Sequence, residues 1–474
     1  MTRREIVERT ITFQKPPRLA MKFDVVGVND CYDVWTHDPT GWTYGFEGRT
    51  ADEWGCVWEK TDVSNTGQVV EHPLKDFAKL AEYRWPDPDD PARYRDFEEQ
   101  LRGAEDRFVM FCFGNGIFER LHMLHGMTET LMDFYVEPER IHELIERILD
   151  HHLRVFRNCV RIANGRMHAA AMADDWGLQD RAFISVELFR EFFKPRYKRW
   201  FDEIKAAGMH PWMHSCGRIN EILEELIDVG LEVINPQQPN TVGIDEISRR
   251  YRGRICFESI VDTQSTLPRG TYEEIRRQAH ELLEKWGTPA GGFIASDYND
   301  AAAIGVTLDR RLVMFEAFAE KGGYPDYKRI VEQMVTDPTL GSLVKVWITG
   351  MDGLIRPRTN AASAIEVRLK PRLGPVSWYS PDAQLGNLQI EVQMGVVGAA
   401  AGTLDMLDVL NLWEAIENAF YPFGDQARQW DIEQRLRDAG SHTGQILFSQ
   451  PATFQGVDRD TNRPILAGMM QLDV

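Results

Sequence analysis

The chain has 474 residues, 43% of them hydrophobic and 27% charged, which is the composition of a globular protein of two or three domains. Its formal net charge of −19, without a polybasic run, argues against a nucleic-acid surface, because phosphate binding needs clustered lysine and arginine. No secretory signal, no membrane span and no paired cysteine spacing is found in the sequence. We therefore expect a cytoplasmic protein that binds neither nucleic acid nor membrane.

Residues 1–104 form a loop-rich N-terminal segment that we expect to lead into the main domain. From residue 105 onward, short apolar runs alternate with amphipathic helical patterns. The runs predict strands at 107–113, 167–175, 209–214, 231–236, 254–260 and 291–297. The amphipathic patterns predict helices at 138–165, 185–208, 220–230, 271–287 and 309–323, with a shorter one near 244–251. Pro195 predicts a kink in the second helix, and Thr271 with Glu274 predicts a capping box at the start of the fourth.

Strands and helices that alternate through short connections indicate a parallel sheet covered by helices. The number of repeats favours an α/β fold closed into a (β/α)₈ TIM-type barrel, with its core at 105–325. The alternation stops near residue 340. Strands at 342–348, 364–369 and 388–395 and an apolar helix at 403–421 predict a C-terminal α+β extension, 340–474, of unknown role.

Polar side chains follow almost every predicted strand of the barrel. Because the chemistry of a barrel lies at the C-terminal ends of its strands, these side chains are the candidate site residues. They include Asn115, Asp174, Asp175, Trp176, His214, Cys216, Gln237, Gln238, Glu258, Asp262, Gln264, Asp297 and Tyr298.

His214 and Cys216 lie two residues apart at the end of one predicted strand, so their side chains point to the same side. An imidazole and a thiolate suit zinc, which needs a third protein ligand and one open position to be catalytic. We expect Asp297 as the third ligand, with Glu258 as the second choice. Alternatively, His214 binds a substrate directly and Cys216 is only a small buried residue.

The other candidates divide into proton donors and substrate contacts. Of the adjacent carboxylates Asp174 and Asp175, only one is expected to enter the pocket. The expected catalytic residues are Asp175, Glu258 and Tyr298. The expected substrate-binding residues are Asn115, Trp176, Gln237, Gln238 and Asp262. Helix capping, a tight turn, a rigid loop or a loop brace are the structural alternatives for these positions.

Several ordered motifs between about residues 50 and 320 resemble the uroporphyrinogen decarboxylase superfamily. They are DEWG (52–55), DDWGLQDRAFISVELFREFFKPRYK (174–198), HSCG (214–217), VINPQQP (233–239), GRICFESIVDTQSTLPRGTYEEI (253–275) and GGFIASDY (291–298). The resemblance implies a (β/α)₈ barrel. The last 130 or so residues take no part in it.

The superfamily implies two chemistries. True decarboxylases bind an acidic tetrapyrrole without a cofactor, through an arginine-rich N-terminal motif, whereas residues 16–35 contain Arg18 but no paired arginines. Corrinoid-linked methyltransferases, including O-demethylases, resemble this chain more closely. Their zinc members carry His-x-Cys and a distant cysteine. His214 and Cys216 match the first half, but the distant cysteine is replaced here by Ser296-Asp297-Tyr298.

The favoured function is therefore a zinc-assisted methyltransferase that moves a methyl group from a small O-methyl donor, for example a methoxylated aromatic, to a corrinoid. The chain has no cobalamin-binding D-x-H-x-x-G pattern, so the resemblance implies a separate corrinoid protein as partner. A cofactor-free lyase of the decarboxylase type and a non-catalytic binding barrel remain as alternatives. The apolar helix at 403–421 could pack against the barrel or a second subunit, so a homodimer is left open.

Overall fold

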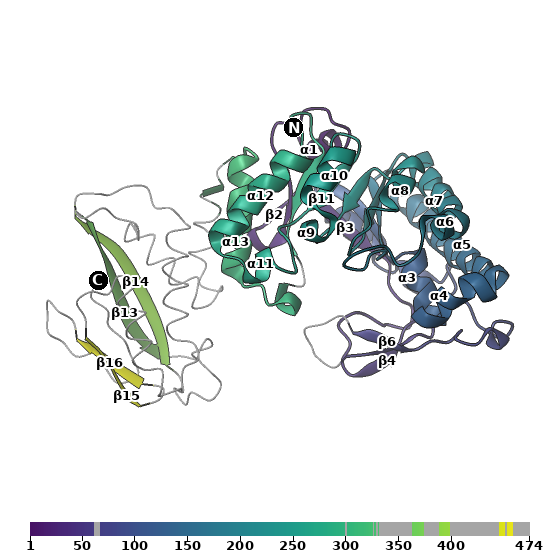
Figure 1. Ribbon diagram of the computed structural model, residues 1–474, viewed down its shortest axis with the longest axis horizontal. Coiled ribbons are helices and arrows are strands. Elements are labelled where there is room, and N and C mark those ends of the chain that lie inside the picture. The colour runs from purple at the N-terminus through teal and green to yellow at the C-terminus, as the bar shows by residue number, and fades with distance from the viewer. Residues whose placement is uncertain are drawn as a thin grey trace. The chain divides into compact units, whose positions relative to one another are not determined.

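The computed structural model describes residues 1–60, 67–298, 301–325, 327–328 and 330, together with four later strands. The chain divides into two compact units, Met1–Tyr324 and Pro325–Val474. Figure 1 shows the helices and strands of both units. None of the helices in these described ranges is long and apolar enough to cross a membrane.

The first unit is a nearly closed barrel of mostly parallel strands with helices outside it (Figure 1). Its sheet has the order β2-β1-β12-β11-β10-β9-β8-β7-β3, and only β2 runs antiparallel to its neighbour. The predicted TIM-type barrel is thus confirmed. The strands are β1 (Ala20–Phe23), β2 (Val28–Asn29), β3 (Cys31–Trp35), β7 (Phe108–Asn115), β8 (Ala169–Ala173), β9 (His210–His214), β10 (Val233–Asn235), β11 (Cys256–Ser259) and β12 (Phe293–Ser296).

Asp30 joins the two ends of this sheet, between β1 and β3. Its backbone N–H donates to the carbonyl of Met21 at 2.8 Å, and its side chain accepts from the Met21 N–H at 2.9 Å. Its own carbonyl accepts from the N–H of Phe108 on β7 at 2.8 Å. Asp30 therefore supplies hydrogen bonds at the place where β1 and β3 do not pair as strands.

The barrel interior is filled by one layer of side chains to which each of the eight parallel strands contributes. Helix α1 (Arg3–Ile11) covers the N-terminal end of the barrel with Ile6, Val7 and Ile11. The layer consists of Ala20, Cys31, Phe108, Met110, Ala169, Trp212, Val233, Cys256 and Ile294. Because this end is packed, only the opposite end, where the strands terminate, is left for chemistry.

The covering helices agree with the periodicity of the sequence to within a few residues. Before β8 they are α2 (Phe97–Arg102), α3 (Ile117–His125), α4 (Met127–Val136) and α5 (Pro138–Ala163). After β8 they are α6 (Val186–Leu188), α7 (Lys194–Ala206), α8 (Leu223–Asp228), α9 (Pro239–Val242), α10 (Ile244–Tyr251), α11 (Thr266–Arg269), α12 (Tyr272–Trp286) and α13 (Leu308–Lys321). The capping box of Thr271 and Glu274 is confirmed at the start of α12.

The predicted kink at Pro195 takes the form of a π-helical segment, Phe189–Phe193, immediately before α7. Proline has no N–H to donate, and its ring crowds the carbonyl four residues earlier, which belongs to Glu191. That carbonyl instead accepts from the Arg196 guanidinium at 3.3 Å. The wider turn thus relieves the clash without ending the helix.

Two barrel strands, β1 and β3, come from the loop-rich segment before residue 105. They have only four and five residues, too few for a periodic signal to be recognised in the sequence. The same segment forms a three-stranded antiparallel sheet of β4 (Arg49–Ala51), β5 (Val57–Glu59) and β6 (Gln68–Glu71). This sheet lies beside α3, where the N–H of Leu74 donates to the carbonyl of Leu124 (Figure 1).

In the second unit the described residues form two antiparallel pairs. One pair is β13 (Ser363–Leu373) with β14 (Leu388–Gly398), and the other is β15 (Gln445–Gln450) with β16 (Thr453–Val457). The strands predicted at 364–369 and 388–395 are confirmed by the first pair. The strand predicted at 342–348 and the helix predicted at 403–421 lie outside the described residues.

An ion pair fastens α1 to the closed end of the barrel. His210 Nε2 lies 3.2 Å from Glu8 Oε1, and its Nδ1 contacts Glu232. Burial opposes a charge on the imidazole, but the two carboxylates outweigh it and raise the pKa of His210 to about 9. Since this folded-state pKa exceeds the unfolded one, the added stability is complete below pH ~6.5 and is lost as the pH rises through 9.

We therefore expect His210→Asn to lower the free energy of unfolding on the order of 2 kcal/mol at pH 6, allowing for solvent screening of the glutamates. The gap between variant and wild type should nearly close at pH 9.5. Urea unfolding at the two pH values, followed by tryptophan fluorescence, measures it. A gap that does not change with pH would show that His210 acts only by packing.

Candidate active site

A cavity of about 330 Å³ opens at the C-terminal ends of the barrel strands. This is the end at which barrel enzymes carry out their chemistry. Its walls come from β1, β3 and β7 to β12 and from the loops that follow some of them. The lining residues are Lys22, Asp24, Asp33, Trp35, Met110, Cys112, Gly114, Ala171, Met172, Ala173, Trp212, His214, Asn235, Gln237, Glu258, Ser296, Asp297 and Tyr298.

His214, which lines this cavity, forms a three-residue cluster with Cys216 and Asp175. His214 Nε2 lies 3.3 Å from Cys216 Sγ and 3.5 Å from Asp175 Oδ1. One ligand atom of each residue lies within 4.8 Å of the other two, a spacing that could hold a metal ion. The carboxylate of Asp175 also accepts from the backbone N–H of Cys216 at 2.7 Å, which holds the acid beside the thiol.

The cluster forms because two loops approach each other without intervening side chains. The N–H of Gly177 donates to the carbonyl of Cys216 at 3.2 Å. A Cβ atom on Gly217 would collide with the carbonyl of Gly177, and Gly217 also has a positive φ of 74°. Glycine is the residue that tolerates both conditions. The glycines that end the DDWG and HSCG motifs therefore allow Asp175 to reach His214 and Cys216.

The surroundings of His214 suit a metal ligand. Asn235 donates its amide N–H to the carbonyl of Glu258 at 3.0 Å, so its Oδ1 faces Nδ1 of His214 at 2.8 Å. The oxygen accepts from Nδ1–H and leaves Nε2 directed toward the cluster, the arrangement found behind many metal-bound histidines. Nitrogen, thiolate sulfur and carboxylate oxygen together are the donor set that zinc prefers. The residues present thus fit zinc.

Burial disfavours a charged imidazole, but the neighbouring Cys216 and Asp175 outweigh burial and hold the pKa of His214 well above its usual value. The same negative surroundings that retain a proton would retain a divalent cation, which displaces it.

Asp297 does not lie with His214 and Cys216, contrary to the expectation that it supplies the third ligand. Both of its carboxylate oxygens lie 3.0 Å from Nε of Arg311 on α13, and one of them also accepts from the N–H of Tyr298. It faces the same cavity but is occupied by the guanidinium. Asp175 instead lies beside the pair across the glycine contact, with its ligand atom within 4.8 Å of theirs.

Lys22, Asp33 and Glu258 form a second charged group in the cavity, and the first two were not among the sequence candidates. Lys22 Nζ lies 3.3 Å from Glu258 Oε1 and 3.9 Å from Asp33 Oδ1, above the ring of Trp212. Burial opposes the charge on Lys22, but the two carboxylates outweigh it and hold its pKa well above the usual range. Glu258 also accepts from the indole N–H of Trp212 at 2.8 Å.

Asp33 differs from Glu258 in that no donor within hydrogen-bond distance meets its Oδ1 among the described residues. Burial raises the pKa of the Asp33 carboxyl, and the cation of Lys22 offsets this only in part. A carboxyl group with a raised pKa at a cavity wall is suited to give and take a proton.

Asp174 and Trp176, the neighbours of Asp175, serve the core. Asp174 accepts from the N–H groups of Phe118 and Glu119 at the start of α3, at 3.0 and 2.7 Å, and burial raises its pKa to about 6. Trp176 is fully buried and stacks on Phe118, with ring centroids 4.4 Å apart. Only one of the adjacent acids, Asp175, thus joins the cluster. The expected role of Trp176 as a substrate contact is corrected to a core residue.

The remaining sequence candidates separate into cavity walls and loop braces. Gln237 and Tyr298 line the barrel cavity, and Asn115 lines a neighbouring one. Gln238 accepts from the N–H of Gly217 at 3.2 Å and thereby holds the loop of the cluster. Asp262 is buried and accepts four hydrogen bonds from Asn240, Gln264 and Ser265, so it braces loops rather than facing a substrate.

A sequence model of a known family, Uroporphyrinogen decarboxylase (URO-D), matches residues 56–298, slightly more than half of the chain. The chain belongs to the URO-D family. The matched span contains the cluster of Asp175, His214 and Cys216 together with Glu258 and Tyr298. It begins after β1 and β3, so Lys22 and Asp33 lie outside it.

Solved structures also resemble this URO-D family member. One is a methyltransferase from Methanosarcina mazei, with 17% identity, 56% of this chain and 76% of that chain covered, and a TM-score of 0.43. Another is a chitinase from Chromobacterium violaceum, with 9% identity, 65% and 99% covered, and a TM-score of 0.32. With TM-scores below 0.5, neither supports a functional argument. No curated protein matches the sequence.

Proposed function

We propose that this protein is a methyltransferase that moves a methyl group from a small O-methyl donor to a corrinoid carried by a separate protein. The observation that supports the proposal most is the cluster of Asp175, His214 and Cys216, a donor set that fits zinc, at the mouth of the barrel. When bound there, zinc supplies a Lewis acid that polarises the donor oxygen.

The proposed reaction is a displacement at carbon. The C–O bond of the donor breaks and a bond from the methyl carbon to cobalt forms, with the electron pair supplied by the reduced, cobalt(I) corrinoid. The donor oxygen keeps the electrons of the broken bond and takes up a proton, which yields an alcohol or a phenol. Because an alkoxide or phenoxide leaves poorly, stabilisation of that oxygen is where a protein can contribute most.

We propose a separate role in this reaction for each of the following residues. Asp175, His214 and Cys216 would hold the metal, and Asn235 fixes the orientation of the imidazole. Asp33, whose pKa is raised by burial, is the proton donor that we propose for the leaving oxygen. Lys22 keeps a positive charge in the cavity and stabilises negative charge as it develops.

The contacts of Arg18 count against a decarboxylase that binds a substrate with many carboxylates. Its guanidinium forms two hydrogen bonds to the buried carboxylate of Asp30, at 2.6 and 2.7 Å, and lies over the ring of Tyr324. The one arginine of the segment that corresponds to the decarboxylase motif is therefore engaged within the protein. The acidic cavity residues Asp24, Asp33 and Glu258 would further repel a polycarboxylate.

A methyl-transfer assay with free cob(I)alamin in place of the partner protein tests the proposal. We expect methylated cobalamin and demethylated product in equal amounts from at least one methyl ether, with about one zinc ion bound per chain by elemental analysis. A reaction without cobalamin is the control and should give no product. Zinc-loaded protein that transfers no methyl group from any ether, or that releases carbon dioxide from a carboxylated substrate, would contradict the proposal.

A further inference from the structure

A second cavity, of about 360 Å³, adjoins the barrel cavity, and Trp35 and Gly114 line both. Its size falls in the range of small-molecule sites. The walls come from the ends of β3 and β7, from α3 and α5, and from loops of the N-terminal segment. The lining residues are Trp35, Thr36, His37, Asp38, Trp42, Thr43, Tyr44, Asp52, Glu53, Trp54, Arg93, Phe111, Phe113, Gly114, Asn115, Arg120, His151, His152 and Val155.

Aromatic rings dominate these walls. Trp42 packs edge-on against Tyr44 with centroids 4.8 Å apart, and Phe111 packs in the same way against Phe113 at 4.8 Å. Trp54 contacts the imidazole of His151 at 4.6 Å. Rings held by other rings form a rigid surface on which a further flat ring can pack edge-on or offset.

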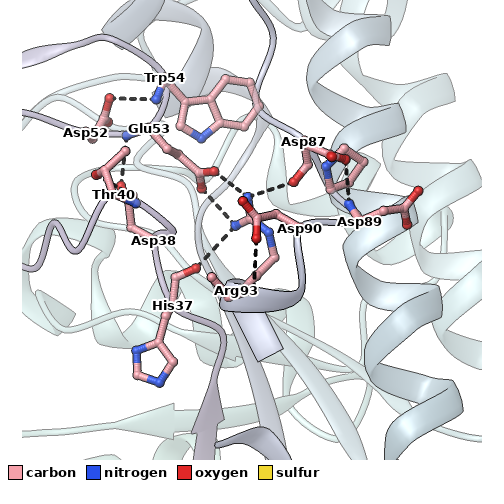
Figure 2. A network of polar contacts seen from close by, with 12 residues as sticks. His37, Asp38, Thr40, Asp52, Glu53, Trp54, Asp87, Asp89, Asp90 and Arg93 are labelled. Carbon is pink, nitrogen blue, oxygen red and sulfur yellow. Dashed lines mark hydrogen bonds and ion pairs between the residues drawn. The ribbon is translucent and has the colours of Figure 1, made fainter. Parts of the chain in front are cut away.

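Both arginines in the wall are already paired with carboxylates. Figure 2 shows the guanidinium of Arg93 facing the carboxylate of Glu53, with one bond of 2.8 Å, and also reaching the carbonyl of Asp87. Arg120 donates to Asp52 at 2.8 Å and lies over the ring of Trp54. Neither arginine is therefore free to neutralise an anionic ligand.

Two of the three histidines in the wall, His151 and His152, are neutral. Burial, assisted by the nearby arginines, lowers the pKa of His152 to about 3 and holds that of His151 well below its usual value. The pocket thus presents rings and neutral imidazoles between closed ion pairs.

Three buried N–H donors of this wall have no acceptor among the residues that the structure describes. They are Nε1 of Trp42, Nε of Arg93 and Nε of Arg120. Because all three atoms are shielded from solvent, they do not face the cavity, and a ligand there would meet the rings and imidazoles instead.

We propose that this second cavity binds an uncharged, planar aromatic ring, next to the barrel cavity in which the reaction takes place. As a specificity pocket for the methyl donor, the site rests on the proposed function. Trp35 and Gly114 line both cavities. A ring bound in the second cavity therefore places a substituent at the edge of the first.

Two other ligand classes fit the wall less well. Three carboxylates, Asp38, Asp52 and Glu53, outnumber two arginines in the lining, so a carboxylate on the ring would be repelled. A quaternary ammonium ion needs open aromatic faces, but the face of Trp54 already carries the guanidinium of Arg120, 5.0 Å from the ring centroid. Both classes serve as comparison ligands.

Calorimetric titration of the full-length protein, without corrinoid, tests the inference with four probes of similar size. They are methoxybenzene, methoxycyclohexane, 4-methoxybenzoate and phenyltrimethylammonium. We expect methoxybenzene to bind, and the dissociation constants of the other three to be roughly tenfold higher or more, as the loss of one or two aromatic contacts would give. Equal or tighter binding of methoxycyclohexane or of either ion would overturn the inference.

Two variants test whether methoxybenzene binds in this cavity. Trp42→Leu and Phe113→Leu, which remove aromatic walls from different segments, should each raise the dissociation constant of methoxybenzene roughly three- to tenfold. Tyr135→Leu removes a ring that is 73% exposed on α4 and is the matched control, expected to bind as the wild type does. Circular dichroism identifies a variant that fails to fold. Unchanged binding in both folded pocket variants would also overturn the inference.

The outcomes separate this inference from the proposed function. If methoxybenzene binds through Trp42 and Phe113 but no methyl group is transferred, the pocket assignment stands and the methyltransferase proposal fails. If the protein demethylates an aliphatic ether and binds no aromatic ring, the methyltransferase proposal stands and the pocket assignment fails.

Discussion

Cys216→Ala, His214→Gln and Asp175→Asn should each reduce bound zinc from about one ion per chain to below about one tenth, because catalytic zinc sites rarely keep the metal with two protein ligands. Each variant should also lower kcat for methyl transfer by about 10³-fold or more, since a Lewis acid contributes several kcal/mol to stabilising the leaving oxygen. Elemental analysis and the cob(I)alamin assay measure the two effects separately.

Two control variants make this result specific. Cys159→Ala removes a buried thiol on α5, outside the cluster, and should retain zinc. Asp297→Asn should also retain zinc, because Asp297 is held by Arg311 rather than by His214 and Cys216. Zinc lost in Asp297→Asn but kept in Asp175→Asn would contradict the cluster and restore the ligand expected from the sequence.

The positions of Asp175 and Asp297 show which part of the candidate site can be predicted from the sequence. Alternation along a strand places His214 and Cys216 on one side, and this spacing is visible without a structure. The third ligand is set by a contact between two loops, which depends on Gly177 and Gly217. A strand-end acid such as Asp297 is equally plausible in the sequence until its partner, Arg311, is seen to occupy it.

The cavity residues that the sequence did not predict were missed for one physical reason. Lys22 and Asp33 lie on β1 and β3, strands of four and five residues without an α-helix between them. Such short runs give no periodicity, and the alternation with helices that identifies a barrel begins only at residue 108. The long helices, in contrast, were predictable because an apolar stripe repeats over several turns, as in α5.

The second cavity could not be predicted from the sequence. The residues that line the aromatic pocket before β7 come from the loop-rich segment, whose tryptophans, charged residues and turns have no regular pattern. Contacts of Trp54 with Arg120 of α3 and His151 of α5 bring this segment to the cavity that Phe113 also lines. Binding specificity thus resides in irregular structure, as is common where a rigid scaffold carries the reacting groups.

Lys22→Met should lower both the free energy of unfolding and kcat by a large amount. The change leaves the carboxylates of Asp33 and Glu258 in a half-buried cavity without the cation that lies between them. Removing one partner of a buried ion pair typically lowers the free energy of unfolding by about 3–5 kcal/mol, and a lost electrostatic contact to the transition state lowers kcat by about 10²- to 10³-fold. Urea unfolding and the cob(I)alamin assay measure these effects.

The pH dependence identifies the cause. Without Lys22, repulsion between Asp33 and Glu258 raises the pKa of one carboxyl further in the folded state, so protonation at low pH stabilises the variant. Its deficit in stability should shrink between pH 8 and pH 5.5, and Glu258→Gln in the same chain should recover part of it at pH 8. Lys22→Arg keeps the charge and should retain most of the stability. A deficit that neither acid nor Glu258→Gln reduces would mean that Lys22 contributes through its packing on Trp212 alone.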